Sequence, residues 1–61
     1  MTAKQLIKLL IQNGYEEIRQ RGSHKIFKNA ETGKQVTIPV HTGKDLKLGT
    51  LNQILKDAGL K

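Results

Sequence analysis

The hydrophobic residues of this 61-residue chain change their spacing along the sequence. Between residues 3 and 13 they recur every three or four positions, which predicts a helix with one apolar face. Thr2 and Gln5 have the spacing of a capping box, in which each side chain satisfies a backbone group at the start of a helix. Asn13 and Gly14 supply the end of this helix.

The next apolar stretches alternate with a period of two and predict a three-stranded antiparallel meander. The first strand covers residues 15–21, where strict alternation puts Tyr15 and Arg19 on the same face. A break at Gly22 leads into the second extended run, residues 23–28. The two strands are therefore expected to form a hairpin.

The buried face of the second strand is left open by the sequence, because Ile26 and Phe27 are neighbours and point to opposite sides. A polar loop over residues 29–34 precedes the third strand, predicted at residues 35–40. Pro39 cannot donate a ladder hydrogen bond, so this end of the strand is expected either at a sheet edge or already leaving the sheet.

A second helical pattern follows a basic loop at residues 41–47, and its first residue is left open. Asp45 offers one cap, and Thr50 with Gln53 offers a second capping box. The Gly59–Leu60 pair has the pattern of a Schellman-type helix end. The predicted order is helix, three strands, helix.

Length and composition indicate a single small α+β domain over residues 1–61, with the sheet packed on two helices. A domain of this size buries only about 60% of the surface exposed by its unfolded chain, so a large enclosed pocket is not expected. The absence of cysteine excludes disulfides and thiolate metal sites. Without a long apolar run for a signal or membrane anchor, the sequence favours a cytoplasmic location and no membrane partner.

Positive charge is concentrated in the middle of the chain. Eleven Lys and Arg residues stand against five Asp and Glu, for a net charge of +6. Seven of the basic residues but only two of the acidic ones lie between Ile18 and Lys47. If both helices cover one face of the sheet, the strands and the basic loop share the other. Such a surface attracts polyanions and positions nucleic-acid phosphates without reading sequence.

His24 follows the turn at Gly22 and is the candidate for acid-base chemistry. Its unperturbed pKa lies close to neutrality. Metal-free cleavage of RNA needs proton transfers at the 2′-hydroxyl and the 5′-oxygen, and a positioned imidazole performs either one. Arg21, Lys25 and Lys28 are candidates for stabilising charge on the phosphate. From the residues alone, a packing or turn-capping role for His24 is equally consistent.

Other chemistries have weaker support. The two histidines, His24 and His41, are 17 positions apart without cysteine, which is not a zinc spacing. Ser23 and His24 are neighbours on a strand and point to opposite faces, as do Glu16 and Glu17. No phosphate-cradling glycine motif is present in the sequence. Neither a metal nor a small-molecule cofactor is expected.

Four segments of the chain resemble the HicA family of toxins: Asn13–Tyr15, Arg19–Phe27, Val36–His41 and Gly49–Leu60. They cover nearly the whole chain in the order and spacing of that family. The resemblance implies an α-β-β-β-α fold similar to the double-stranded RNA-binding domain. It also implies an mRNA interferase of a type II toxin-antitoxin system, and a HicB antitoxin that binds the toxin and masks its active site.

The resemblance places the catalytic histidine of the family on His24. Many members carry a second histidine where this chain has Lys25, so a tandem histidine pair is not available here. His41 matches a frequent family histidine and is given a supporting role in RNA binding or protonation. The expected function is a metal-independent endoribonuclease acting on single-stranded mRNA. The expected RNA-binding residues are Arg21, Lys25, Lys28, His41, Lys44 and Lys47.

Two alternatives remain open at this point. In the first, the chain is a non-catalytic RNA-binding module of the same fold, in which Lys44 and Lys47 contact phosphates and His24 is incidental. Double-stranded RNA is then the better ligand, because such domains read the shape of the duplex. In the second, the basic face serves only to dock an acidic partner protein.

Overall fold

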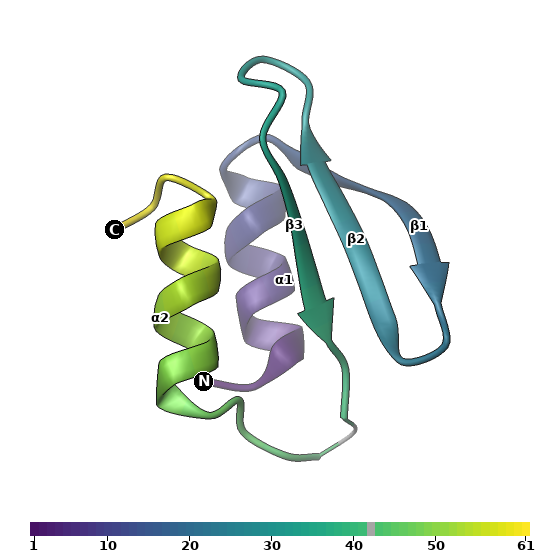
Figure 1. Ribbon diagram of the computed structural model, residues 1–61, viewed down its shortest axis with the longest axis vertical. Coiled ribbons are helices and arrows are strands. Elements are labelled where there is room, and N and C mark those ends of the chain that lie inside the picture. Colours follow the sequence, from purple (N-terminus) through teal and green to yellow (C-terminus); the bar gives the residue numbers. More distant parts are fainter. Residues whose placement is uncertain (42) are drawn as a thin grey trace.

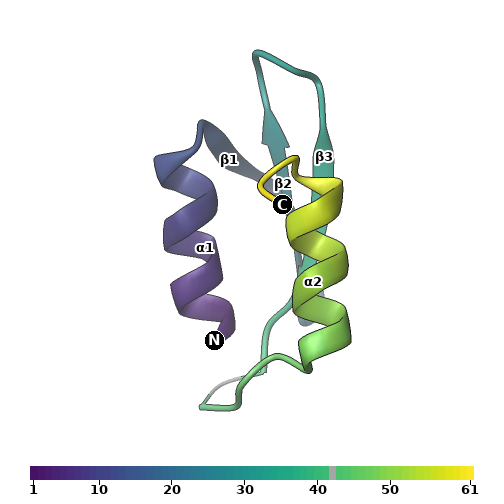
Figure 2. The same cartoon turned by 90° about the vertical axis from the view of Figure 1, so that its left-hand side faces the viewer.

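The computed structural model describes residues 1–41 and 43–61. Its elements in chain order are α1 (Ala3–Gln12), β1 (Tyr15–Arg21), β2 (His24–Asn29), β3 (Gln35–Pro39) and α2 (Leu48–Asp57). The strands form one antiparallel sheet in the order β1-β2-β3. Figure 2 looks onto the two helices, with the sheet behind them. The predicted α-β-β-β-α fold is therefore confirmed.

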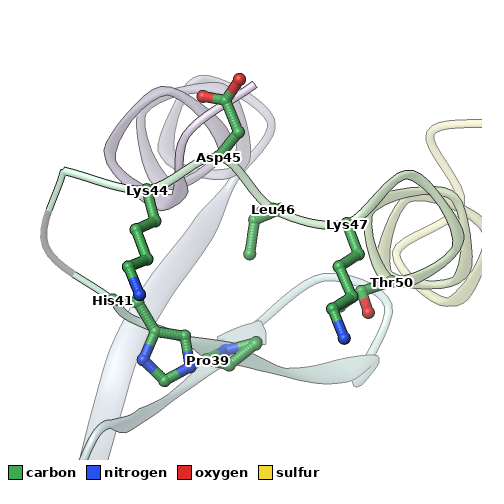
Figure 3. A pocket seen from close by; sticks show the side chains of 7 residues that line it. All are labelled: Pro39, His41, Lys44, Asp45, Leu46, Lys47 and Thr50. Carbon is green, nitrogen blue, oxygen red and sulfur yellow. The ribbon is translucent and has the colours of Figure 1, made fainter.

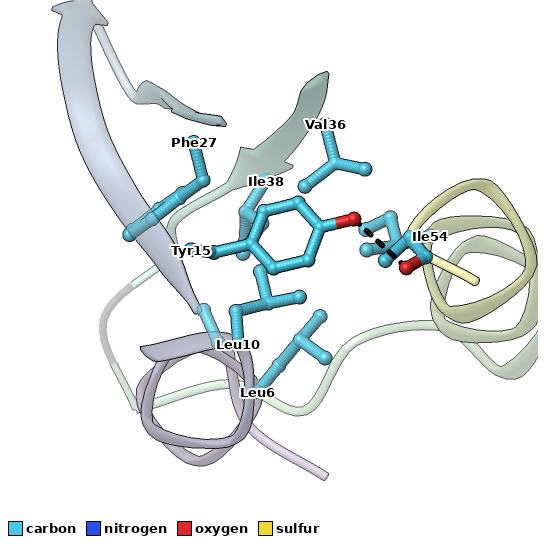
Figure 4. Packing of buried hydrophobic residues seen from close by; sticks show 9 residues of the cluster. Leu6, Leu10, Tyr15, Phe27, Val36, Ile38 and Ile54 are labelled. Carbon is cyan, nitrogen blue, oxygen red and sulfur yellow. Dashed lines mark hydrogen bonds between the residues drawn. The ribbon is translucent and has the colours of Figure 1, made fainter. Parts of the chain in front are cut away.

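The hydrophobic core fills the space between the helices and one face of the sheet (Figure 4). Leu6 and Leu10 of α1 and Ile38 of β3 are fully buried in it. The Tyr15 hydroxyl donates a buried hydrogen bond to the Ala58 carbonyl oxygen over 2.8 Å. This bond joins the first strand to the end of the second helix, 43 residues away.

Phe27 is the β2 residue that faces the helices, which settles the choice that the sequence left open. Its neighbour Ile26 is buried outside this core, on the opposite face of the sheet. We call this helix-free side the open face. Ile26 is only 7% exposed there, between its ladder partners Arg19 and Thr37.

β1 departs from strict alternation. Glu17 pairs with the inward-facing Phe27, but the next pair joins Arg19 to Ile26, and Ile18 has no partner. A bulge of this kind inserts one residue and reverses the faces beyond it. The prediction that Tyr15 and Arg19 share a face was therefore wrong, since Arg19 belongs to the open face.

The first helix begins as its sequence predicts. The Gln5 amide donates to the Thr2 hydroxyl over 3.2 Å, and the Thr2 amide donates to the Gln5 side-chain oxygen over 2.9 Å. The second helix begins differently, because Lys47 is its N-cap and makes no side-chain capping bond. Neither Asp45 nor Thr50 caps it, so both proposed starts were wrong.

The end of α2 is a Schellman motif, as predicted. The Leu60 amide donates to the Leu55 carbonyl oxygen over 2.8 Å, and the Gly59 amide donates to the Lys56 carbonyl oxygen over 3.1 Å. Gly59 has a φ of +75°, which this cap requires. Within the described residues, no helix has the length and apolar character to cross a membrane.

Figure 1 shows that several segments meet at one end of the molecule. The β1–β2 turn, the end of β3 and the start of both helices all lie there. The fold thereby brings the turn that carries His24 to the same end as the basic segment before α2.

Candidate functional site

His24 is the first residue of β2, directly after a two-residue turn. Gly22 has a φ of +60°, the conformation needed at the first central position of a type II′ hairpin turn. A Cβ at Gly22 would meet nothing within 4 Å, so backbone conformation alone requires glycine there. The turn makes Arg21 and His24 cross-strand partners, and the His24 side chain is exposed.

On the other side, His24 is the ladder partner of Pro39. The Val40 amide donates to the Ser23 carbonyl oxygen over 2.7 Å. Hydrogen-bonded and non-hydrogen-bonded pairs alternate along an antiparallel ladder, so the next pair, His24–Pro39, is a non-hydrogen-bonded one. Pairs of this type hold their side chains closest together. The missing N–H of Pro39 costs nothing here, because β3 is an edge strand, as predicted.

The open face around His24 carries positive charge. Arg21, His24 and Pro39 form one cross-strand row, and Arg19 belongs to the next row. Lys28 is on the same face but four residues along β2, roughly 13 Å away at the usual rise per residue. Its ladder partner in β1 is an acid, Glu16, so the excess of positive charge is greatest at the His24 end.

Lys25 is not brought together with His24. Its ladder partner Ile38 is fully buried in the core, which places Lys25 on the helix-facing side of the sheet. There its Nζ atom forms an ion pair with Glu17 Oε1 over 3.1 Å, and both side chains are partly exposed. An ion pair of this kind at the surface contributes little to the stability of the fold.

The basic segment before α2 forms a pocket with the end of β3 (Figure 3). The volume of this pocket is about 420 Å³. Its lining residues are Pro39, His41, Lys44, Asp45, Leu46, Lys47 and Thr50. Three of the residues predicted to bind RNA are therefore together in one hollow, and Pro39 connects that hollow to His24.

The segment that carries Lys44 and Lys47 is hydrogen-bonded to the first residues of the chain. The Leu46 amide donates to the Met1 carbonyl oxygen over 2.9 Å, and Thr2 forms a single antiparallel bridge with Asp45. These contacts position the segment that carries Lys44 and Lys47 beside the pocket. The isolated bridge has no alternating pattern in the sequence, so it was not predicted.

Solvent reaches both imidazoles, since His24 and His41 are exposed. An exposed imidazole on a basic surface is accessible to a bound polymer. Among residues 1–41 and 43–61, no three His, Cys, Asp or Glu side chains are grouped to hold a metal ion.

Comparison with protein families places the chain beside a known one. The family model for the HicA toxin of bacterial toxin-antitoxin systems matches residues 3–60, nearly the whole chain. The matched range contains both helices, all three strands and both histidines. A search of curated proteins found no match.

Proposed function

The chain belongs to the HicA toxin family, and from that premise we propose that it is an endoribonuclease that cuts single-stranded mRNA with His24 as the catalytic residue. HicA toxins are known as mRNA-cleaving toxins of toxin-antitoxin systems. The observation that best supports this role is the exposed His24 side chain between Arg21 and Pro39. In this position the imidazole has a cross-strand neighbour on each side and is exposed to a long substrate.

The proposed reaction needs no metal. The 2′-oxygen attacks the neighbouring phosphorus atom, the bond from phosphorus to the 5′-oxygen breaks, and a cyclic phosphate and a 5′-hydroxyl form. His24 either takes the proton from the 2′-hydroxyl or gives one to the leaving oxygen, and water performs the other transfer. Arg21, the cross-strand partner of His24, donates hydrogen bonds to the phosphate oxygens as negative charge develops.

The RNA is proposed to run from the open face towards the start of α2. Arg21 lies on the β1 side of His24, and Lys44 and Lys47 line the pocket on the β3 side. His41 is in that same pocket and supports RNA binding or protonation. Lys28 contacts RNA further along β2. Lys25, on the other face, is the weakest of the RNA-binding candidates.

The natural inhibitor is proposed to be a HicB-type antitoxin. The site is shallow and lies on an uncovered sheet face, so a partner protein can mask His24 without entering a cleft. The positive charge of the site favours a partner with acidic groups at the contact. Inhibition then follows from exclusion of RNA.

The proposal is tested with a long single-stranded RNA and a perfect duplex of the same sequence, each incubated with the purified chain in EDTA. Cleavage of the single strand and much slower cleavage of the duplex are expected. Tight binding of intact duplex without any cleavage would instead support the RNA-binding module. No cleavage together with no RNA binding would leave protein docking as the function.

A further inference from the structure

The pocket at the start of α2 has two different walls (Figure 3). Pro39 and His41 form the wall from the end of β3, and Leu46 points towards them from the opposite side. Lys44 and Lys47 flank Leu46 and extend in the same direction. The interior is thus apolar, and its rim is cationic.

The one acid of the pocket does not neutralise this rim. Asp45 points away from the β3 wall in Figure 3, and its backbone forms the bridge to Thr2. The lysines are therefore available to an anionic ligand. An apolar hollow with a few charged groups at its edge is typical of sites for small organic molecules, whose volumes are about 300–1,000 Å³. At about 420 Å³ this pocket is near the lower limit of that range.

Pro39 belongs to both this pocket and the His24 row. A ligand that contacts Pro39 in the pocket therefore lies next to the cross-strand neighbour of the proposed catalytic imidazole. A position beside His24 suits a polymer that spans both sites better than a free metabolite, which would contact the pocket alone.

We infer that the pocket holds one unpaired nucleotide of the RNA, adjacent to the phosphate that is cut. Its base lies between Pro39 and Leu46, and Lys44 and Lys47 bind the phosphates on either side. A base in a duplex is stacked and paired and cannot enter without being extruded. This inference rests on the proposed function, and it explains why single strands are the substrate.

The first test measures binding alone, with a short single-stranded RNA whose riboses are all 2′-O-methylated and therefore cannot be cut by the proposed reaction. Thr50→Trp fills the pocket from α2 without changing its charge. Gln53→Trp adds the same ring one helical turn later, at an exposed position outside this pocket. We expect Thr50→Trp to weaken binding about tenfold, a loss of about 1.4 kcal/mol, and Gln53→Trp to leave it within about twofold. Equal affinities for all three proteins would overturn the inference.

The second test leaves the protein unchanged and removes one base from the RNA. An abasic nucleotide is moved through the methylated strand, one position at a time. At one position, the abasic nucleotide is expected to weaken binding to the wild type about tenfold. The same substitution is expected to cause no further loss of affinity for Thr50→Trp. If every position tolerates the abasic nucleotide equally, no base is held and the inference fails.

These results are separable from those on the proposed function. If unmodified RNA is cut but Thr50→Trp and the abasic series have no effect, the ribonuclease stands and the nucleotide pocket does not. If the methylated strand shows the pocket effect but unmodified RNA is never cut, the pocket is real and the catalytic proposal fails.

Discussion

Pro39 lies directly opposite His24, at a non-hydrogen-bonded position of the β2–β3 ladder. The side chains of such a pair approach closely, so the rigid pyrrolidine ring limits the space open to the imidazole. Pro39 also lines the pocket at the start of α2. One residue thereby connects the proposed catalytic group to the proposed RNA-binding groups.

Replacing Pro39 by Ala is expected to slow RNA cleavage about tenfold, because the imidazole is less well oriented. The single-turnover rate at saturating RNA is the measurement, since it separates orientation from affinity. Thr37→Ala is the matched control, two residues earlier on the same strand and face. A Pro39→Ala rate equal to that of the control would show that the ring does not position His24.

The lysines of the pocket are expected to determine how salt affects RNA binding. For single strands, each phosphate contact contributes about 0.7 to the slope of log affinity against log salt concentration. Lys44→Gln and Lys47→Gln are each expected to reduce the slope by about that amount. The slope is obtained from titrations at several salt concentrations.

Lys25→Gln is the control for those titrations. Its side chain is paired with Glu17 on the helix-facing side of the sheet, so the slope is expected to stay unchanged. An equal reduction in all three variants would mean that the charges act only through the total charge of the protein. That result would contradict a localised phosphate path.

The hydrogen bond from Tyr15 to Ala58 predicts a stability effect without a catalytic one. Tyr15→Phe leaves the buried Ala58 carbonyl oxygen without its donor, which costs about 1–2 kcal/mol in the free energy of unfolding. Urea unfolding measures this loss. Cleavage by the folded variant is expected to be unchanged, because Tyr15 lies in the core on the other side of the sheet from His24. Slower RNA cleavage by Tyr15→Phe, with an unchanged free energy of unfolding, would contradict a purely structural role for this hydroxyl.

Burial also raises the pKa of Tyr15 above its ordinary value of 10.0. The unfolded chain therefore loses this proton at lower pH than the folded chain does. The contribution of Tyr15 to stability is fully present below pH 10 and is lost as the pH rises through the folded pKa. The stability difference between wild type and Tyr15→Phe is expected to shrink above pH 10. A stability difference that stays constant above pH 10 would contradict a raised pKa for Tyr15 in the folded protein.

Local sequence signals predicted the ends of the helices where the cap depends on particular residue types. The Thr2–Gln5 box and the Gly59–Leu60 turn depend on residues a few positions apart, so their pattern is visible in the sequence. The start of α2 was missed because it has no side-chain cap at all. Lys47 takes that position through the path of the backbone, for which the sequence has no local signal.

The candidate site was predicted in part for the same reason. The Gly22 turn places His24 at the start of β2 by local rules, and the sequence predicted this strand start to within one residue. Which cations accompany it depends partly on the bulge in β1, which is set by tertiary packing, and Arg19 therefore joined the open face unexpectedly. Lys25 lies on the face opposite His24, as the alternation of neighbouring strand residues predicts.

The most direct test of the catalytic role of His24 compares cleavage of single-stranded RNA in EDTA by His24→Gln and by the wild type. His41→Gln serves as the control, and urea unfolding establishes that all three proteins are equally folded. We predict that His24→Gln binds RNA normally but cuts at least about a hundredfold more slowly, while His41→Gln loses much less of the cleavage rate. Cleavage by His24→Gln at the wild-type rate would contradict the central claim that this imidazole performs the proton transfer.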